Sequence, residues 1–249
     1  MLIGLNQLLS PKTVLSVNLT LGYADGYLDD PYRRTTFLLP DSPDPIFSDS
    51  ASVNASAEHR PSHRFKQVGY TSLTQFIKPL DASIEGSYRL YHDDWGILAN
   101  TVSITWNQKL GRHLTLSPLF RFYHQTAASF YAPSFQGVSF DEYAGGTRVA
   151  FQDGAFIGFE GDPGFPTTSE EKAYNILTVP ARPQYYSSDY RLSEFEALTV
   201  GITGQIKLGE HVTLDLGYKR YKMHGLDALT PRAAYSSANI LTIGCGLWF

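Results

Sequence analysis

The densest cluster of residues that could do chemistry is the run His92, Asp93 and Asp94. A histidine beside two carboxylates suits hydrolysis, because one group can take a proton from water while a neighbour orients the water. His224, much later in the chain, is a candidate to complete such a site. The same residues also suit a turn, in which an Asp accepts backbone hydrogen bonds and Gly96 supplies a positive φ. A turn explains these residues without requiring a partner from elsewhere in the chain, so we favour the turn over a hydrolytic site.

Two other groupings carry weaker chemical signals. His124 and Ser129 could be a base and a nucleophile, but no oxyanion donor or orienting acid stands at a fixed spacing from them. Asp25, Asp29 and Asp30 could bind calcium through oxygens, but their spacing is not that of an EF-hand loop. The sequence therefore assigns no catalytic residue, cofactor or metal ligand, and it favours a protein that is not an enzyme.

Charge and cysteine content exclude other functions. The formal net charge is −4 and the pI is near 6.0, so the chain offers no broad basic field for nucleic acid. Cys245 is the sole cysteine, which excludes an intrachain disulfide and a cysteine metal cluster. It stands among alternating apolar residues, and we expect a small side chain facing lipid rather than a reactive thiol.

Most of the chain alternates between apolar and polar residues, the pattern of strands with one buried face. The expected strands span 13–23, 64–77, 82–91, 98–110, 113–125, 197–208, 211–221 and 241–249, with a short strand before Ser10. Most are about 9–13 residues long, which is the length that a tilted strand needs to cross a bilayer. Tight turns at 10–12, 78–81, 111–112 and 209–210 alternate with outer loops at 24–63, 92–97, 125–190 and 224–236. Short turns at one end and long loops at the other are typical of outer-membrane barrels.

The two faces of these strands differ in kind. One carries Leu, Val, Ile and aromatic residues, and the other carries Thr, Ser, Asn and Gln with occasional charges. The exposed face of a soluble sandwich would be richer in Lys and Glu, so this milder face indicates an interior that other strands overlook. The charged residues expected to face that interior, and to tune ion or solute preference, are Glu85, Arg89, Arg121, Lys207, Asp215 and Lys219.

Aromatic residues gather near the strand ends that lead into the long loops. They are Tyr23, Tyr88, Tyr91, Phe122, Tyr123, Tyr218 and Tyr221. Tyr is frequent in any β structure. In a membrane barrel the same residues predict a belt at the level of the lipid headgroups.

The end of the chain resembles the C-terminal assembly signal of bacterial outer-membrane β-barrels, a final Phe preceded by apolar residues at every second position. The residues of this pattern are Leu241, Ile243, Cys245, Leu247 and Phe249. The start of the chain shows no export signal, since residues 1–7 lack a positive segment followed by a long apolar one. We therefore expect an export signal upstream of Met1. Single-chain bacterial barrels usually have an even number of strands, so the count of about nine predicts at least one further strand upstream as well.

Several motifs resemble an uncharacterised family of outer-membrane β-barrel proteins, known as a domain of unknown function. They are residues 26–32, 60–61, 91–97, 121–131, 187–193 and 247–249. The resemblance implies the C-terminal portion of a longer barrel. It brings no assigned activity, so it assigns no residue a role.

Together these patterns predict an all-β, antiparallel transmembrane β-barrel of the outer-membrane type, with about nine strands in one domain spanning 1–249. The expected location is the bacterial outer membrane, with lipid, lipopolysaccharide and the barrel-assembly machinery as partners. The expected function is a pore or a component of an envelope transport assembly. The alternatives are a surface hydrolase using the 92–94 loop and a soluble secreted β-domain that binds a ligand.

Overall fold

The computed structural model describes residues 1–38, 55–138, 145–153, 155–209 and 211–247. The chain divides into two compact units. The first contains residues 1–25, 63–129 and 193–249, and the second contains residues 26–62 and 130–192. The helical elements of the described residues are short 3-10 turns, and none of them has the length and apolar character to span a membrane.

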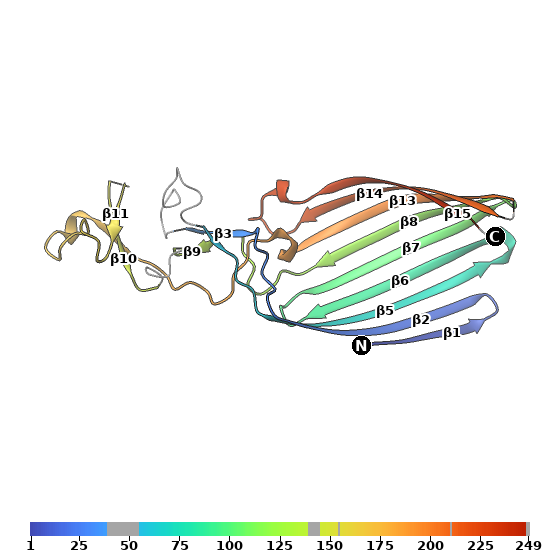
Figure 1. Ribbon diagram of the computed structural model, residues 1–249, viewed down its shortest axis with the longest axis horizontal. Coiled ribbons are helices and arrows are strands. Elements are labelled where there is room, and N and C mark those ends of the chain that lie inside the picture. The colour runs from blue at the N-terminus through green and yellow to red at the C-terminus, as the bar shows by residue number, and fades with distance from the viewer. Residues whose placement is uncertain (39–54, 139–144, 154, 210, 248–249) are drawn as a thin grey trace. The chain divides into compact units, whose positions relative to one another are not determined.

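The first unit is built on one antiparallel sheet of nine strands in the order β1-β2-β5-β6-β7-β8-β13-β14-β15, drawn side by side in Figure 1. The strands are β1 (Leu2–Ser10), β2 (Thr13–Asp25), β5 (His63–Ile77), β6 (Ala82–Asp93), β7 (Leu98–Leu110), β8 (Leu114–Gln125), β13 (Phe195–Leu208), β14 (Val212–Gly225) and β15 (Ser237–Leu247). Within this sheet each strand pairs with the next along the chain. The number of long strands predicted from alternation is confirmed.

Tight turns join the strands at one end of this sheet. The connection from β5 to β6 is a 3-10 turn, η1 (Lys78–Leu80), followed by Asp81 in the left-handed region at φ 46°. Gly111, between β7 and β8, has φ 67°, a conformation that glycine adopts without steric cost. The turns expected from the sequence at 10–12, 78–81 and 111–112 are therefore present.

Strand register keeps the two sequence faces apart over the whole sheet. Leu15 lies opposite Leu73, and Val102 lies opposite Phe122, while Ser103 lies opposite Arg121. Because side chains alternate along each strand, in-register pairing places most of the Leu, Val and Ile positions on one side. We call this side the apolar face and the opposite side the polar face.

The described residues leave the apolar face uncovered. Ile202, Leu216 and Ile243 are 46%, 50% and 73% exposed. Among the described residues β1 and β15 do not pair with each other, so the sheet has two edges. The predicted all-β antiparallel class is confirmed by this sheet.

The second unit holds short strands where the sequence predicted only loops. One small sheet has the order β11-β10-β12, and the other has the order β4-β3-β9, with β3 and β9 parallel. Their bounds are β3 (Arg34–Leu38), β4 (Ala55–Ala57), β9 (Phe135–Gln136), β10 (Arg148–Gln152), β11 (Ala155–Phe159) and β12 (Asn175–Thr178). A strand of two to five residues is too short to display a clear alternation, so the pattern search missed these.

The second unit also has its own apolar core. Val138, Val149, Phe151, Phe159 and Val179 are buried together, with Phe156 and Leu177 packed against them. The segments 24–63 and 125–190, expected as outer loops, thus supply nearly all of a folded unit. The expectation of one domain over the full chain stays a prediction.

Candidate functional site

The structure separates the residues of the 92–94 run. His92 and Asp93 are consecutive residues of strand β6, so their side chains point to opposite faces of the sheet. His92 lies on the apolar face and is exposed, whereas Asp93 lies on the polar face and is 1% exposed. Asp94 is exposed and accepts a hydrogen bond from the backbone N–H of Phe65. The run does not converge on one point where water could be activated.

The Asp93 carboxylate is fully engaged in holding the local structure. Its Oδ2 atom accepts hydrogen bonds from Arg64 Nη2 at 2.6 Å and from the Tyr91 hydroxyl at 2.6 Å. Its Oδ1 atom accepts the backbone N–H groups of Trp95 and Ile97 at 3.1 and 3.0 Å. With Gly96 at φ 88°, this is the turn that the sequence favoured.

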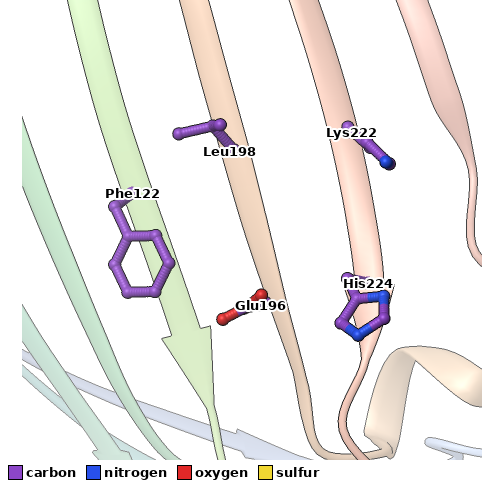
Figure 2. A pocket seen from close by; sticks show the side chains of 5 residues that line it. All are labelled: Phe122, Glu196, Leu198, Lys222 and His224. Carbon is purple, nitrogen blue, oxygen red and sulfur yellow. The ribbon is translucent and has the colours of Figure 1, made fainter.

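His224 lies far from His92 in the sheet. Four strand steps separate β6 from β14, or roughly 19 Å along the sheet at about 4.8 Å per step. His224 instead lines a shallow pocket on the apolar face with a volume of about 360 Å³. Figure 2 shows its lining side chains on three neighbouring strands, Phe122 on β8, Glu196 and Leu198 on β13, and Lys222 and His224 on β14.

The structure describes both His124 and Ser129, the possible base and nucleophile, and gives no hydrogen bond between them. His124 points to the apolar face, where its Nε2 atom lies 3.7 Å from Glu194 Oε1. Ser129 donates its backbone N–H to the carbonyl of Trp95. Among the described residues no group of three or more His, Cys, Asp or Glu side chains could hold a metal ion.

The six residues expected to face an interior all lie on the polar face of the nine-stranded sheet. Glu85 and Arg89 have this parity in β6, Arg121 has it in β8, Lys207 in β13, and Asp215 and Lys219 in β14. Residues directly opposite each other on neighbouring strands share a face. Ser87 lies opposite Ser103, and Ser103 lies opposite Arg121, so the polar positions of β6, β7 and β8 lie on the same side. Asp215 accepts a hydrogen bond from Gln205 on the same face.

The polar face has a pocket of about 400 Å³ near the ends of β8, β13 and β14. Its lining residues are Arg121, Tyr123, Phe195, Ala197, Thr199 and Tyr221. The Tyr123 hydroxyl donates to Gln125 Oε1 at 2.6 Å, and Gln125 Nε2 donates to the carbonyl of Ser193 at 2.8 Å. The Arg121 guanidinium thus lines a pocket together with Tyr221 and with Tyr123, whose hydroxyl is held by a hydrogen bond.

The predicted aromatic belt is only partly on the apolar face. Tyr23, Tyr88, Phe122 and Tyr218 have the apolar parity, but Tyr91, Tyr123 and Tyr221 belong to the polar face. The expectation of one outward belt was wrong for these three residues. The expectation was based on how near each residue lies to the end of its strand. Alternation assigns the face instead, because the odd-numbered residues of β6, β8 and β14 all lie on the polar face.

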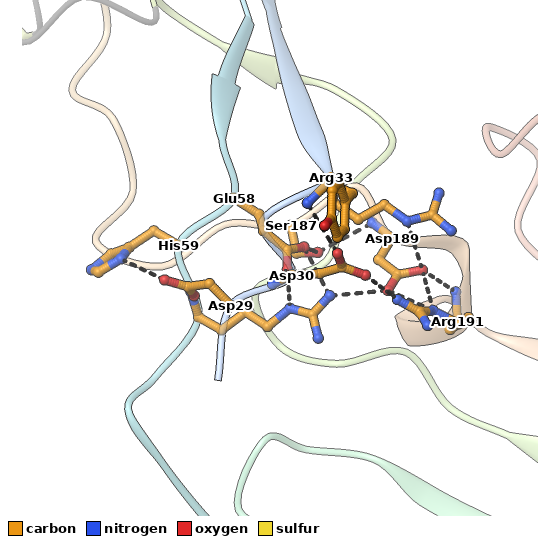
Figure 3. Close-up of polar contacts among 10 residues, drawn as sticks. Asp29, Asp30, Arg33, Glu58, His59, Ser187, Asp189 and Arg191 are labelled. Atoms are coloured by element: carbon orange, nitrogen blue, oxygen red, sulfur yellow. Dashed lines mark hydrogen bonds and ion pairs between the residues drawn. The ribbon is translucent and has the colours of Figure 1, made fainter. Parts of the chain in front are cut away.

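The second unit contains a network of charged residues, shown in Figure 3. Arg60 Nε lies 2.6 Å from Glu58 Oε1, and Arg60 Nη2 lies 2.9 Å from Asp189 Oδ2. Arg191 Nη2 lies 2.6 Å from Asp189 Oδ2 and 2.7 Å from Asp30 Oδ2. The Arg60–Asp189 and Arg191–Asp30 contacts join segments of the chain that are more than 100 residues apart in sequence.

Ionised carboxylates are stabilised in this network. Burial raises the pKa of Asp189, but the hydrogen bonds from Arg191 outweigh it and hold that pKa below its ordinary value. The backbone N–H of Tyr32 and the Arg191 guanidinium lower the pKa of Asp30. The Ser187 hydroxyl donates to Glu58 at 2.6 Å and so adds a hydrogen bond to this network.

Three of the motifs that carry the family resemblance meet in this network. Residues 26–32 supply Asp30, residues 60–61 supply Arg60, and residues 187–193 supply Asp189 and Arg191. The motif at 91–97 forms the Asp93 turn. Sequence reasoning recognised these motifs but not what they do, because their partners lie in distant parts of the chain.

Four of the five residues of the predicted assembly signal lie within the described part of the chain, all of them on strand β15. Leu241, Ile243, Cys245 and Leu247 lie on the apolar face of β15, paired with Tyr218, Leu216, Leu214 and Val212. Cys245 is exposed. Phe249 lies outside the described residues.

Two solved structures contain chains that are similar to this one at low identity. The siderophore receptor PirA from Pseudomonas aeruginosa is 14% identical with a TM-score of 0.42, and the match covers 97% of this chain and 37% of that one. The FpvAI–pyocin S2 complex is 13% identical with a TM-score of 0.35, covering 97% and 33%. The chain thus spans about a third of the length of these chains.

The curated proteins contain no match to this chain. A family model described as a protein of unknown function, DUF3570, matches residues 1–235. That range includes the charged network, the Asp93 turn and eight of the nine strands of the main sheet. The chain therefore belongs to the DUF3570 family.

Proposed function

We propose that this protein is a bacterial outer-membrane β-barrel that acts as a pore or as a component of an envelope transport assembly. The observation that carries the proposal is the uncovered apolar face of the nine-stranded sheet. Soluble monomers rarely expose a contiguous apolar patch of more than a few hundred Å². Here exposed Leu, Val, Ile or Phe side chains of the apolar face lie on each of the nine strands of this sheet.

Strand length supports the same proposal. The nine strands are 9 to 15 residues long, and a strand tilted by about 45° needs about 9–11 residues to cross a bilayer. Within hydrocarbon an open sheet edge leaves backbone groups without partners, at several kcal/mol each. We infer that in the membrane the edges at β1 and β15 are paired, so that the sheet is part of a closed cylinder.

In such a closed cylinder the two faces of the sheet contact different environments. The apolar face contacts the hydrocarbon of lipid and the acyl chains of lipopolysaccharide, and the polar face contacts a water-filled interior. In this proposal the residues Leu241, Ile243, Cys245, Leu247 and Phe249 are read by the barrel-assembly machinery.

The alternatives have less support. A hydrolase needs a base and an orienting acid that converge, and His92 lies on the face opposite to Asp93. A soluble ligand-binding domain needs a cover for the apolar face, and the described residues of the first unit place no second layer over Ile202, Leu216 or Ile243.

Membrane fractionation tests the location. The full-length protein, exported in a Gram-negative host, is expected in the outer-membrane fraction and to resist extraction with carbonate. Unboiled samples are expected to migrate differently from boiled samples on SDS gels. Recovery from the soluble periplasm, with migration that heating does not change, would overturn the proposal.

Conductance tests the pore role separately. Detergent-purified protein in a planar bilayer is expected to give discrete current steps. A protein that inserts and is heat-modifiable but gives no steps would retain the membrane location and lose the pore role.

A further inference from the structure

We propose that the interior formed by the polar face selects for anions, so that the pore passes small anionic solutes in preference to cations. This inference rests on the proposed function and names the class of solute. It comes from the distribution of charge between the two faces of one sheet, which register and alternation define.

Positive charge is concentrated on the polar face. Its cations are Arg64, Lys66, Lys109, Arg89, Arg121, Lys207 and Lys219, and its carboxylates are Glu85, Asp93 and Asp215. Seven cations against three carboxylates leave a surplus of four positive charges on this face. The whole chain, in contrast, has a formal net charge of −4.

The apolar face shows no such surplus. Its charged strand residues are Arg220 and Lys222, balanced by Asp25 and Glu196. The positive surplus therefore belongs to one side of the sheet and does not follow from the composition of the strands as a whole.

Most of the polar-face cations have no counter-ion of their own. Arg64 is paired with Asp93, and Lys109 Nζ lies 3.9 Å from Asp81 Oδ1 in the adjacent turn. Within the described residues Lys66, Arg89, Arg121, Lys207 and Lys219 take part in no ion pair. Unpaired charges on a wall that faces water are free to attract mobile ions of the opposite sign.

Two of these cations are held close to phenol rings near the loop end of the sheet. The Arg89 guanidinium lies 5.6 Å from the centre of the Tyr91 ring, and Arg121 lines the polar-face pocket with Tyr123 and Tyr221. A guanidinium offers paired N–H donors that match carboxylate and phosphate oxygens. Rings of Arg and Lys are the arrangement that anion-passing pores use.

Reversal potentials measure the selectivity. With full-length protein in a planar bilayer and KCl at about 0.1 M on the dilute side, a chloride-to-potassium permeability ratio on the order of 3 to 10 is expected. The ratio is expected to fall towards 1 near about 1 M KCl, since the Debye length shrinks from about 10 to about 3 Å.

A matched pair of double variants locates the effect. Arg89→Gln with Arg121→Gln removes two positive charges from the polar face and is expected to lower the permeability ratio at least about twofold. Arg220→Gln with Lys222→Gln removes the same charge from the apolar face and is expected to leave the ratio unchanged. Heat-modifiable migration on SDS gels establishes that each variant is folded.

The outcomes separate the inference from the proposed function. A wild-type channel that prefers potassium, or an Arg89/Arg121 variant with unchanged selectivity, overturns the inference and leaves the pore in place. Inserted protein without conductance removes the pore role and this inference with it, but not the membrane location. Failure to insert defeats the proposed function itself.

Discussion

The two faces of the nine-stranded sheet are made by the same strands and differ in almost every physical property. One side displays exposed Leu, Val and Ile with balanced charges, and the other displays Thr, Ser, Asn and Gln with a surplus of positive charge. Only the parity of a residue decides which side it joins. The same substitution made at two neighbouring positions of one strand therefore compares the two faces at nearly the same place in the backbone.

The largest difference is expected at the neighbours Asp93 and His92. Asp93→Ala removes a buried carboxylate and leaves the Arg64 guanidinium without its partner, which costs about 3–5 kcal/mol for buried ion pairs. His92→Ala, at an exposed position on the other face, is expected to change stability by no more than about 0.5 kcal/mol. Urea unfolding of the detergent-folded protein, followed by Trp fluorescence, measures both.

Equal stability of the two variants would show that the Asp93 turn does not support the fold. Hydrolytic activity lost in His92→Ala alone, with the fold intact, would instead revive the surface-hydrolase alternative.

The next difference is expected at the centre of β13. Ile202→Arg places a charge on the face proposed to contact hydrocarbon and is expected to cost about 2–4 kcal/mol in a bilayer. Thr203→Arg places the same charge on the proposed water-filled side, where a smaller cost is expected. Folding in lipid vesicles, assayed by heat-modifiable migration against urea concentration, compares them. A smaller loss for Ile202→Arg than for Thr203→Arg would assign the faces the other way round.

The charged network of the second unit is expected to respond to acid. The pKa values of Asp30 and Asp189 lie below their ordinary values, so these carboxylates stabilise the fold above the unfolded pKa near about 3.9. This contribution is lost as the pH falls through the lower folded pKa values. Limited proteolysis at 26–62 and 130–192 is therefore expected to accelerate below about pH 4 and to be flat from about pH 5 to 7.

Two variants give the control for the acid response. Asp189→Asn is expected to accelerate cleavage already at neutral pH and to weaken the acid dependence. Glu160→Gln breaks an exposed pair with Arg148 and is expected to have little effect, since exposed ion pairs contribute little. Acid-independent cleavage of the wild-type protein would contradict a stabilising role for the network.

The smallest effect on stability is expected at Cys245. Cys245→Ala on the exposed apolar face is expected to change stability by no more than about 0.5 kcal/mol. In vesicles Cys245 is expected to be protected from a water-soluble maleimide. Thr213→Cys, made in the Cys245→Ala protein, places a thiol on the polar face and is expected to be modified. Fast modification of Cys245 in vesicles would contradict its contact with lipid.

Alternation alone was enough to predict the long strands, the tight turns at 10–12, 78–81 and 111–112, and the shared face of the six charged residues expected to line an interior. Each of these follows from local geometry, because side chains alternate within one strand whatever it pairs with. The six residues expected on the interior side share one face for this reason. The same rule, applied to Tyr91, Tyr123 and Tyr221, would have placed them on the polar face as well.

The local pattern could not show which residues meet across strands. Arg64 and Asp93 are 29 residues apart, and Arg60 and Asp189 are 129 apart, so their contacts depend on strand pairing and chain folding. For the same reason His92 and His224 could be grouped in the sequence although four strand steps separate them. Short strands such as β9 and β4 form only because a partner is brought to them.

The sequence by itself determined the period of the strands and the chemical character of the two faces, since both are local properties of the chain. Only the tertiary structure decided the pairing of Arg64 with Asp93, the charged network around Asp189 and the separation of the histidines. Those contacts join residues far apart in the chain, and their positions depend on register and packing that no single segment encodes.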